Sequence, residues 1–503
     1  PRKSTASGDE LEKIRNKKKR MTAERGGRMK KANLFIISDL HLSAGYNEET
    51  KSYSREEDFF FDNEFRRFLE HLEKEFPGSN HLIINGDVFD FLQVNGDFAA
   101  KMEKEGKAKL ERSERDYGLG TEPDKTVLKL QRIMDGHKTF FAALRNFLAN
   151  GNELSIISGN HDIELFWEKV REELANILSN KDAAIKNKIK FYPWFYYDKD
   201  NGIYIEHGNQ YDNWNSFKII INPVMPEPDK KEKILLPFGS FFVRYFFNKV
   251  EDFNPFADNI KPSSRYMAWA FKTHPLRSLR LLRRYVPALF KAFFRSGGLS
   301  KAQEAGLIKE AEPRFNAIIQ ETGLSRETLD KLNSKMIPPV TRGKLAFIIN
   351  SAWLGTIVFM LLIFALALFI QQIFALSFWS LLTSLLGLLF PVVQWLISKF
   401  RKDQTGKILR GIKKEILKEV KIIVMGHTHD PDIRKIGEDC WYYNTSTWTT
   451  VFSDEERLIR EEKQFALLKI KLTDKGSDAQ LMRWNDAVGE CEPLILFEKQ
   501  KNA

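Results

Sequence analysis

The sequence has only two cysteines among its 503 residues, Cys440 and Cys491. Two cysteines cannot build a disulfide framework, so packing must hold the fold together and a reducing compartment is expected. Residues 1–31 also lack an apolar stretch of the length that a secretory signal needs. We therefore expect the main folded part of the chain to stay in the cytoplasm.

Charge is missing from a long internal segment. Leu345–Ser398 contains 54 residues without one Asp, Glu, Lys, Arg or His. About 20 apolar residues span a bilayer, so this segment predicts a transmembrane hairpin with spans near Phe347–Ile370 and Phe378–Ile397. Basic residues flank the segment on both sides, which favours two ends in the cytoplasm. The alternatives are a helical hairpin buried in a soluble core and a hairpin that enters the membrane without crossing it.

Acidic residues are absent from a second stretch, Asn259–Gln303, which carries ten Lys and Arg. Within it, Leu276–Arg295 alternates leucines and aromatics with arginines at three- and four-residue steps, typical of a basic amphipathic helix on a membrane surface. Helices of a cap that packs on the rest of the protein would give the same pattern, and both interpretations can hold together.

Aromatic residues are absent from the first 31 residues, where twelve Lys and Arg stand against four acids. Such a block is typical of a solvated, flexible tail, although anionic lipid or nucleic acid could also attract it. Without aromatics the tail offers no platform for stacking bases, so it does not by itself indicate a nuclease.

What the sequence does contain is a repeated pattern of short apolar runs that end at polar clusters. β-branched runs of four to six residues stopped in this way predict buried strands. The five runs are Asn33–Ser38, His81–Asn85, Leu154–Ser158, Ile203–Glu206 and Lys421–Met425. Between the second and third, Lys125–Ala149 predicts a crossover helix, and Gly96–Asp124 predicts a mobile loop or frayed helix.

The polar clusters consist of residues that bind metal ions. Chemistry in α/β sheets collects beyond the carboxyl ends of the strands, so these side chains are expected to converge. Carboxylate and imidazole together suit Mn²⁺, with Fe²⁺ or Zn²⁺ as alternatives. The predicted metal ligands are Asp39, His41, Asp87, Asn160, His207, His427 and His429.

These clusters together resemble the five sequence blocks of the calcineurin-like metallophosphoesterases. The matching motifs are Asp39-x-His41, Gly86-Asp87-x-x-Asp90, Gly159-Asn160-His161-Asp162, His207 and Gly426-His427-x-His429. The resemblance implies an α/β fold, a four-layer α/β/β/α sandwich, here with an inserted helical cap and the transmembrane hairpin.

The same resemblance implies two divalent ions that share Asp87. One ion would be held by Asp39, His41 and His429, and the other by Asn160, His207 and His427. His161 would act as an acid for the leaving oxygen or as a clamp on the phosphate, and Asp162 would orient it. A hydroxide held between the two cations would attack phosphorus in line.

The predicted organisation is a tail over 1–31, a phosphoesterase domain over 32–229 and 401–503, a basic cap over 230–343 and the hairpin over 344–400. An apolar cap between the fourth and fifth blocks is similar to UDP-2,3-diacylglucosamine hydrolases, which act on lipid A precursors. This chain departs from them in having His161 where they commonly carry Arg, and in its hairpin.

The first functional hypothesis is a membrane-anchored phosphoesterase that cleaves a phosphodiester or diphosphate in a lipid-linked substrate. The second is a phosphodiesterase for a soluble or cyclic nucleotide that uses the membrane only as an anchor. The third is a scaffold without catalysis, which the complete set of ligands disfavours. The expected partners are membrane lipid and a phosphate-containing substrate, and the hairpin argues against nucleic acid.

Overall fold

The computed structural model describes residues 33–94, 96–225, 232–245, 299–343, 404–452, 460–473 and 476–496, with short pieces of 363–387. The predictions for the tail and for the amphipathic stretch 276–295 lie outside these residues, as do those for most of the hairpin. Within the described ranges, no helix combines the length and the apolar character that crossing a bilayer requires.

One of the two main sheets has seven strands in the order β18-β17-β16-β1-β4-β5-β6. Its centre is parallel, with β1 beside β4, β4 beside β5 and β5 beside β6, whereas β16 to β18 add an antiparallel flank. The strands are β1 (Asn33–Ile37), β4 (Asn80–Asn85), β5 (Glu153–Ile157), β6 (Ile189–Tyr192), β16 (Ala466–Thr473), β17 (Gly476–Asn485) and β18 (Glu490–Pro493).

The other main sheet has five strands in the order β12-β13-β11-β8-β7. Here β11 runs parallel to both β8 and β13, and the outer strands are antiparallel. The strands are β7 (Phe195–Asp198), β8 (Ile203–Glu206), β11 (Ile422–Met425), β12 (Asp432–Lys435) and β13 (Trp441–Asn444). Three two-stranded ribbons complete the described strands: β2 (Tyr46–Asn47) with β3 (Ser52–Tyr53), β9 (Val224–Met225) with β10 (Lys233–Ile234), and β14 (Thr450–Phe452) with β15 (Arg460–Lys463).

The two main sheets face each other across a shared apolar core. Ile36 and Ile83 from one sheet and Ile205 and Val424 from the other belong to the same buried cluster. Alternate residues on the same strands, such as Leu82 and Ile423, point the other way and pack in the cluster that includes the helices. This alternation buries both faces of each central strand.

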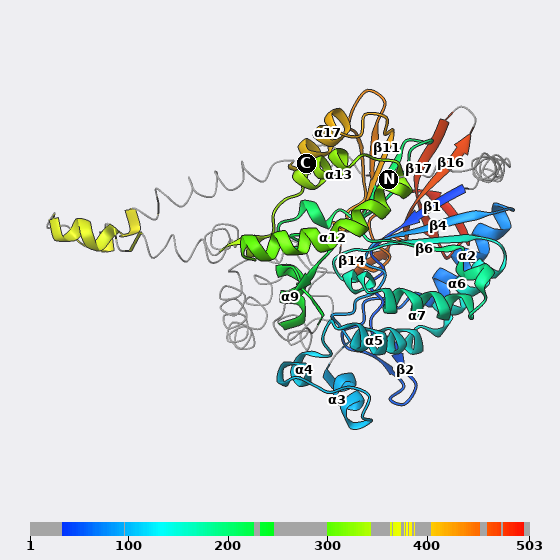
Figure 1. The fold of residues 1–503 in the computed structure, drawn as a ribbon, viewed down its shortest axis with the longest axis horizontal. Helices are drawn as coiled ribbons and strands as arrows, with labels where there is room; N and C mark the ends of the chain where they lie inside the picture. Colours follow the sequence, from blue (N-terminus) through cyan, green and yellow to red (C-terminus); the bar gives the residue numbers. More distant parts are fainter. Residues whose placement is uncertain are drawn as a thin grey trace, which may run out of the picture.

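Helices cover the outer faces, with α2 and α6 beside the seven-stranded sheet and α13 and α17 beside β11 (Figure 1). The order α/β/β/α therefore describes the layers, and the predicted α/β class is confirmed. The helices are α2 (Asp62–Glu75), α3 (Gly96–Lys104), α4 (Arg112–Tyr117), α5 (Pro123–Gly136), α6 (Lys138–Ala149), α7 (Glu168–Ser179), α8 (Ala183–Lys186), α9 (Phe238–Tyr245), α12 (Lys301–Thr322), α13 (Arg326–Lys335) and α17 (Gln404–Glu415). Short 3-10 turns are η1 (Ile163–Phe166), η2 (Asn209–Tyr211) and η4 (Val340–Arg342).

All five predicted strands are confirmed, as β1, β4, β5, β8 and β11. The continuous helix predicted over 125–149 is wrong, because it is broken at His137 into α5 and α6. The break follows from a close approach: a Cβ on Gly136 would lie 2.1 Å from the carbonyl oxygen of Ala44. Asp62 then accepts a hydrogen bond from the amide of Phe140 in the first turn of α6.

The mobile loop or frayed helix predicted over 96–124 is also wrong, because this segment forms α3 and α4. Ala99, Met102 and Leu119 build a small apolar core of their own. The carboxylate of Glu114 accepts hydrogen bonds from Lys125 at 2.6 and 2.7 Å and is nearly buried. Because the segment is rich in charged residues, this local packing could not be recognised from the sequence.

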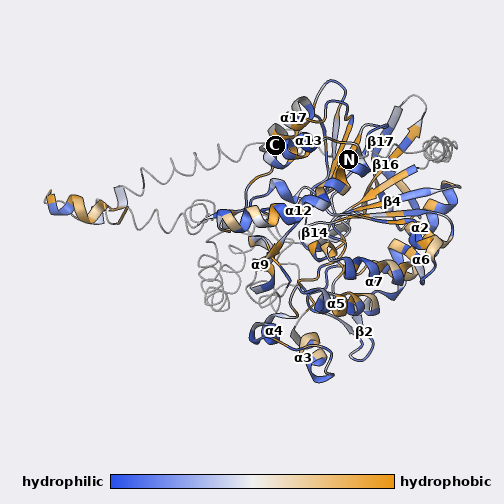
Figure 2. Ribbon diagram, viewed as in Figure 1, coloured by the Kyte–Doolittle hydropathy of each residue, from blue (hydrophilic) through white to orange (hydrophobic). Residues whose placement is uncertain are grey.

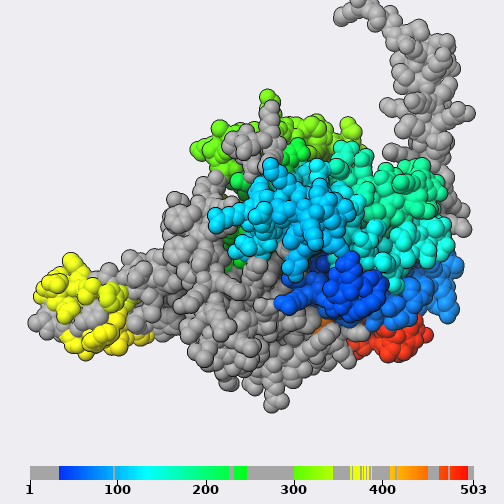
Figure 3. Space-filling model, turned by 90° about the horizontal axis from the view of Figure 1, so that it is seen from below, coloured from blue at the N-terminus to red at the C-terminus, as the bar shows by residue number. Residues whose placement is uncertain are grey.

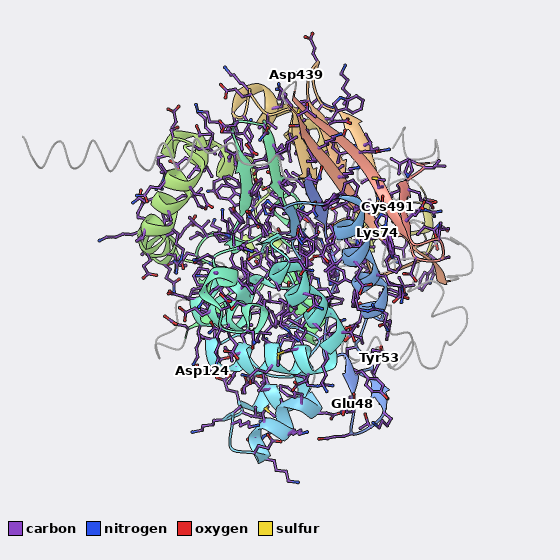
Figure 4. The ribbon with its side chains drawn as sticks, turned by 90° about the vertical axis from the view of Figure 1, so that its right-hand side faces the viewer. Glu48, Tyr53, Lys74, Asp124, Asp439 and Cys491 are labelled. Carbon is purple, nitrogen blue, oxygen red and sulfur yellow. The ribbon has the colours of Figure 1, made fainter. Side chains whose placement is uncertain are left out.

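A groove of about 1200 Å³ separates the β2–β3 hairpin from α3 and α4. Figure 3 shows its two walls as the blue surface of the hairpin and the cyan surface of the helices. Tyr46, Tyr53, Phe98 and Lys101 are among the lining residues. Figure 4 places Glu48 and Tyr53 at the outer end of the hairpin, away from both sheets.

Both cysteines are free. Cys440 is buried just before β13, next to the Asp439 that is labelled at one end of the molecule in Figure 4. Cys491 lies on β18, the edge strand of the seven-stranded sheet, in a different part of the molecule.

Candidate metal centre

The predicted ligands come from five loops, each of which follows the carboxyl end of a parallel strand. Three loops follow β1, β4 and β5 of one sheet, and two follow β8 and β11 of the other. The site therefore lies where the ends of two sheets meet, rather than along the edge of one sheet.

Within the part of the chain that the structure describes, these loops form three overlapping groups of possible metal ligands. In each group, the ligand atoms lie within 4.8 Å of one another. The groups are Asp39, His41 and His429; His41, Asp87 and His161; and Asp87, His207 and His427. Asp87 and His41 connect the groups, which matches a pair of sites that share a carboxylate.

The shortest distances run between carboxylates and imidazoles. His207 Nε2 lies 3.0 Å from Asp87 Oδ2, and His429 Nε2 lies 3.2 Å from Asp39 Oδ1. His41 Nε2 is 3.3 Å from the same nitrogen of His429 and 3.9 Å from Asp87 Oδ2. Three imidazole nitrogens and two carboxylate oxygens thus converge on the same small volume.

Five of the seven predicted ligands have a left-handed backbone, which is uncommon for residues other than glycine. The φ angles are 55° at Asp39, 53° at His41, 50° at Asp87, 67° at His427 and 61° at His429. Such conformations cost on the order of 1–3 kcal/mol each and persist where surrounding contacts enforce them. The strands position these residues, and the strained turns orient their side chains.

Glycines allow the loops to approach one another. A Cβ on Gly86 would lie 2.2 Å from His207 Nδ1, and one on Gly159 would lie 2.2 Å from Asp87 Oδ1. Gly86 also has a φ of 81°. The Gly-Asp spacing in the second block is therefore explained by the need for a residue without a side chain beside His207.

The side chains fit divalent cations, because two of their buried polar atoms suit a metal ion. Asn160 Oδ1 has no hydrogen-bond partner, and His207 Nε2 meets the carboxylate of Asp87 at 3.0 Å; both side chains are 1% exposed. The opposite nitrogen of His207, Nδ1, lies 2.9 Å from the carbonyl oxygen of Asn85 and donates its proton there. That contact fixes the tautomer in which Nε2 is the ligand atom.

The electrostatics also favour cations. Burial raises the pKa of Asp39 and Asp87, but the imidazoles of His207 and its neighbours outweigh this and hold both pKa values well below the ordinary range. Burial lowers the pKa of His207, whereas Asp87 and Asp39 raise it to about 9. A proton and a metal ion therefore compete for His207 Nε2.

His161 lies in the group with His41 and Asp87, and its side chain is more exposed than those of His41 and His207. Its Nδ1 is 2.5 Å from Asp90 Oδ2, and its backbone amide donates to Asp87 Oδ1. Burial raises the pKa of Asp90, but the charges and hydrogen bonds of His161 and His41 lower it well below its ordinary value. Asp90 is completely buried, and its Oδ1 accepts hydrogen bonds from the amides of Leu92 and Gln93.

The prediction that Asp162 orients His161 does not agree with the contacts. Asp162 accepts hydrogen bonds from the backbone amides of Gly159 and Val88, at 2.6 and 2.8 Å. It therefore ties the third-block loop to the second-block loop. The carboxylate on the imidazole is instead that of Asp90, the last residue of the Gly86-Asp87-x-x-Asp90 motif.

Several supporting residues had no signal in the sequence. Asp212 Oδ2 lies 3.2 Å from His427 Nε2, and the hydroxyl of Thr447 donates to the carbonyl oxygen of Asp39. Buried His137 lies between Glu57 and Asp62, and Glu57 accepts a hydrogen bond from the amide of Gly45. Most of these contacts join segments far apart in the chain, so the spacing of residues could not indicate them.

Comparison with known families agrees with this geometry. Residues 32–236 match the profile of the calcineurin-like phosphoesterases. The chain therefore carries a calcineurin-like phosphoesterase domain and is a metal-dependent phosphoric ester hydrolase. A search of curated proteins found no match.

The matched region ends before two of the ligands. His427 and His429 follow β11, and β16 pairs with β1, so strands beyond residue 236 complete the same two sheets. The strands of each sheet are therefore continuous in space but separated in the sequence, because the segment between β10 and β11 lies between them.

Proposed function

We propose that this protein is a membrane-anchored phosphoesterase that hydrolyses a phosphodiester or diphosphate bond in a lipid-linked substrate, using two divalent ions, Mn²⁺ first among them. The observation that carries the catalytic part is the convergence of five loops on overlapping groups of carboxylates and imidazoles.

Two bound ions would supply Lewis acidity, which lowers the pKa of water and offsets charge on phosphoryl oxygens. The residues of the chain contribute position and protons. Asp39, Asp87 and the imidazoles would hold the ions, and Asp90 would hold the ring of His161 through Nδ1. In that orientation Nε2 of His161 is the atom that can give a proton to the leaving oxygen.

Two observations support the membrane part of the proposal. His207 and His427 belong to one ligand group although the charge-free segment lies between them, so the chain must return to the side from which it left. The described pieces of that segment also carry exposed apolar side chains, including Phe369 at 64%, Ile373 at 58% and Trp379 at 71%. Figure 2 shows these pieces standing away from both sheets.

The proposal of a lipid-linked substrate is based on the sequence. A basic, aromatic-rich cap beside an apolar hairpin would attract anionic headgroups and bring the metal centre to their plane. The likeness of this arrangement to UDP-2,3-diacylglucosamine hydrolases makes lipid-linked diphosphates the first substrates to try. A soluble nucleotide or cyclic nucleotide is the second candidate, for which the hairpin would be an anchor alone.

The test is hydrolysis by the detergent-purified full chain with Mn²⁺. A panel of lipid-linked diphosphates and phosphodiesters is compared with the matching water-soluble headgroups and with cyclic nucleotides, and Asp87→Ala is the control. We expect the lipid-linked substrates to be cleaved at least tenfold faster, and the Asp87→Ala variant to be inactive because both ligand groups around Asp87 lose a member.

Equal rates on lipid and headgroup would reject the lipid substrate and favour the second candidate. Rates that match those of Asp87→Ala on every substrate would reject the enzymatic proposal for this panel. Release of the full chain from membranes by alkaline carbonate would reject the anchor, whatever the substrate.

A further inference from the structure

We propose that Asp212 and Ser240 are positioning residues for one of the two ions, the one held by Asp87, Asn160, His207 and His427. The inference rests on the proposed two-ion site. Neither residue belongs to the five sequence blocks, and Ser240 lies beyond the region that matches the family.

Asp212 acts on His427. Its Oδ2 lies 3.2 Å from His427 Nε2, so an Nε2 proton donated to this carboxylate leaves Nδ1 as the ligand atom that the ring would offer to the group it forms with Asp87 and His207. A carboxylate on the far nitrogen of a ligand imidazole fixes the tautomer and raises the basicity of the ligand.

The carboxylate of Asp212 is itself held in place. Its Oδ1 accepts the amide proton of Trp214 at 3.0 Å, and its Oδ2 accepts a proton from the side-chain amide of Asn215 at 2.7 Å. This turn leaves Asp212 little freedom to leave the imidazole. The same turn contacts α9, because the amide of Gly239 donates to the carbonyl oxygen of Trp214.

Ser240 acts on Asn160. Its hydroxyl is completely buried and donates to the carbonyl oxygen of Asn160 at 3.2 Å. The Oδ1 atom of the same asparagine is the buried acceptor without a partner. Ser240 would therefore fix the backbone of the residue whose side chain is proposed to hold the ion.

The helix that carries Ser240 is docked at both ends. At its start, Phe238 packs against Trp214 with ring centroids 4.8 Å apart. At its end, Arg244 donates to the carbonyl oxygen of Gly118 at 2.7 Å. A Cβ on Gly239 would lie 2.0 Å from Asn215 Oδ1, so the helix sits directly on the Asp212 turn.

The supports of the other ligand group come from different elements. The carbonyl oxygen of Asp39 accepts the Thr447 hydroxyl and the Trp448 amide, both just after β13. Weakening Asp212 or Ser240 should therefore affect one ion and spare the ion held by Asp39, His41 and His429.

The experiment measures metal content rather than turnover. The full chain is freed of metal by chelation and titrated with Mn²⁺, and bound ions are followed by calorimetry and by electron paramagnetic resonance, which distinguishes a lone Mn²⁺ from a coupled pair. The variants are Asp212→Asn, Ser240→Ala and Ser240→Thr. The matched controls are Asp198→Asn, a turn carboxylate held by Asn201, and Ser179→Ala, a buried serine on α7.

We expect the wild type and both controls to bind two ions. In Asp212→Asn and Ser240→Ala, one ion should bind as in the wild type and the other about 10-fold to 100-fold more weakly, with the coupled signal lost at intermediate Mn²⁺. Ser240→Thr should restore the second ion, because it keeps the hydroxyl.

Equal binding of both ions in Asp212→Asn and Ser240→Ala would overturn the inference while leaving the two-ion site intact. Equal weakening of both ions would also overturn it, since a general loss of structure does not select one ion. Fewer than two ions in the wild type would instead reject the two-ion site, and the inference with it. If Asp212→Asn does not fold, the comparison of Ser240→Ala with Ser240→Thr tests the inference by itself.

Discussion

At the scale of single residues, the carboxylates of the metal centre divide between holding ions and holding other side chains. Asp39 and Asp87 belong to the ligand groups, whereas Asp90 and Asp162 do not. Asp90 contacts the imidazole of His161, and Asp162 contacts two backbone amides. Because the partners differ, the loss of each carboxylate should have a different consequence.

Replacing Asp90 with Asn should lower kcat about 10-fold to 100-fold with little change in KM, because a neutral amide orients His161 without stabilising its charged form. Replacing Asp162 with Asn should instead lower the free energy of unfolding by about 1–3 kcal/mol, since an amide group would face a backbone N–H. Steady-state kinetics and thermal unfolding of the two variants check this. A larger loss of kcat in Asp162→Asn, at unchanged stability, would contradict the assignment.

At the same scale, the sequence identified the metal ligands better than the residues that hold those ligands in place. Asp39, His41 and His207 were found because each follows an apolar run, and strand ends gather in space. Asp212 and Ser240 act through contacts between distant loops, for which spacing along the chain carries no information. Asp162 is adjacent to His161 in sequence, yet its carboxylate contacts two backbone amides and Asp90 contacts the imidazole, because adjacent residues in a turn point in different directions.

At the scale of elements, the break between α5 and α6 holds the loop that follows β1. His137 at the break lies 3.2 Å from Glu57 and 3.0 Å from Asp62, and Glu57 also accepts the amide proton of Gly45. Burial lowers the pKa of His137, but Glu57 and Asp62 raise it to about 9. The charged imidazole therefore links α2, the helix break and the loop that carries His41.

This link predicts a pH dependence of stability. Because the pKa of His137 is raised on folding, its contribution is complete below about pH 6.5 and is lost as the pH rises toward 9. His137→Gln should be less stable than the wild type by about 3 kcal/mol at pH 6.5, as for a broken buried pair, and the difference should shrink by pH 9. Denaturant unfolding at a series of pH values measures it.

The control for this series is His71→Gln. His71 is partly buried against Trp484, and burial lowers its pKa instead of raising it. The difference between this variant and the wild type should not shrink between pH 6.5 and 9. A difference for His137→Gln that stays constant or grows with pH would refute the linkage.

Whether a strand or helix could be predicted from the sequence depended on which contacts stabilise it. Strands buried on both faces appeared as continuous apolar runs, so β1, β5 and β11 could be recognised directly. The break at His137 depends on Ala44 and Asp62, which lie on other elements, and helical periodicity continues across it. α3 and α4 were missed because their apolar residues are few and their charges many.

At the scale of the whole molecule, the phosphoesterase domain depends on strands from both halves of the chain. β8 lies between β7 and β11, and β1 lies between β4 and β16. The region that matches the family includes β1 and β8 but lacks β11 and β16. Without these strands, one edge of each sheet and the shared core would be open.

A fragment of residues 32–236 should therefore fail to fold. We expect no cooperative thermal transition, rapid proteolysis and no tight binding of Mn²⁺, because His427 and His429 are missing as well. In a second experiment, the same fragment is mixed with a fragment of residues 404–496. A cooperative thermal transition should appear in the mixture if the two fragments assemble. A cooperative transition in 32–236 alone would show that the missing strands are dispensable.

The pairing of β1 with β16 also sets an order of events during synthesis. Asn33 pairs with Lys471, more than 400 residues later, although β1 can pair with β4 as soon as residue 85 is made. At a synthesis rate of roughly 5–20 residues per second, the second edge of β1 stays unpaired for on the order of 20–90 s before β16 is made. An open strand edge invites pairing with other chains, so the newborn protein needs a chaperone, or cover from its own insertion, throughout that interval.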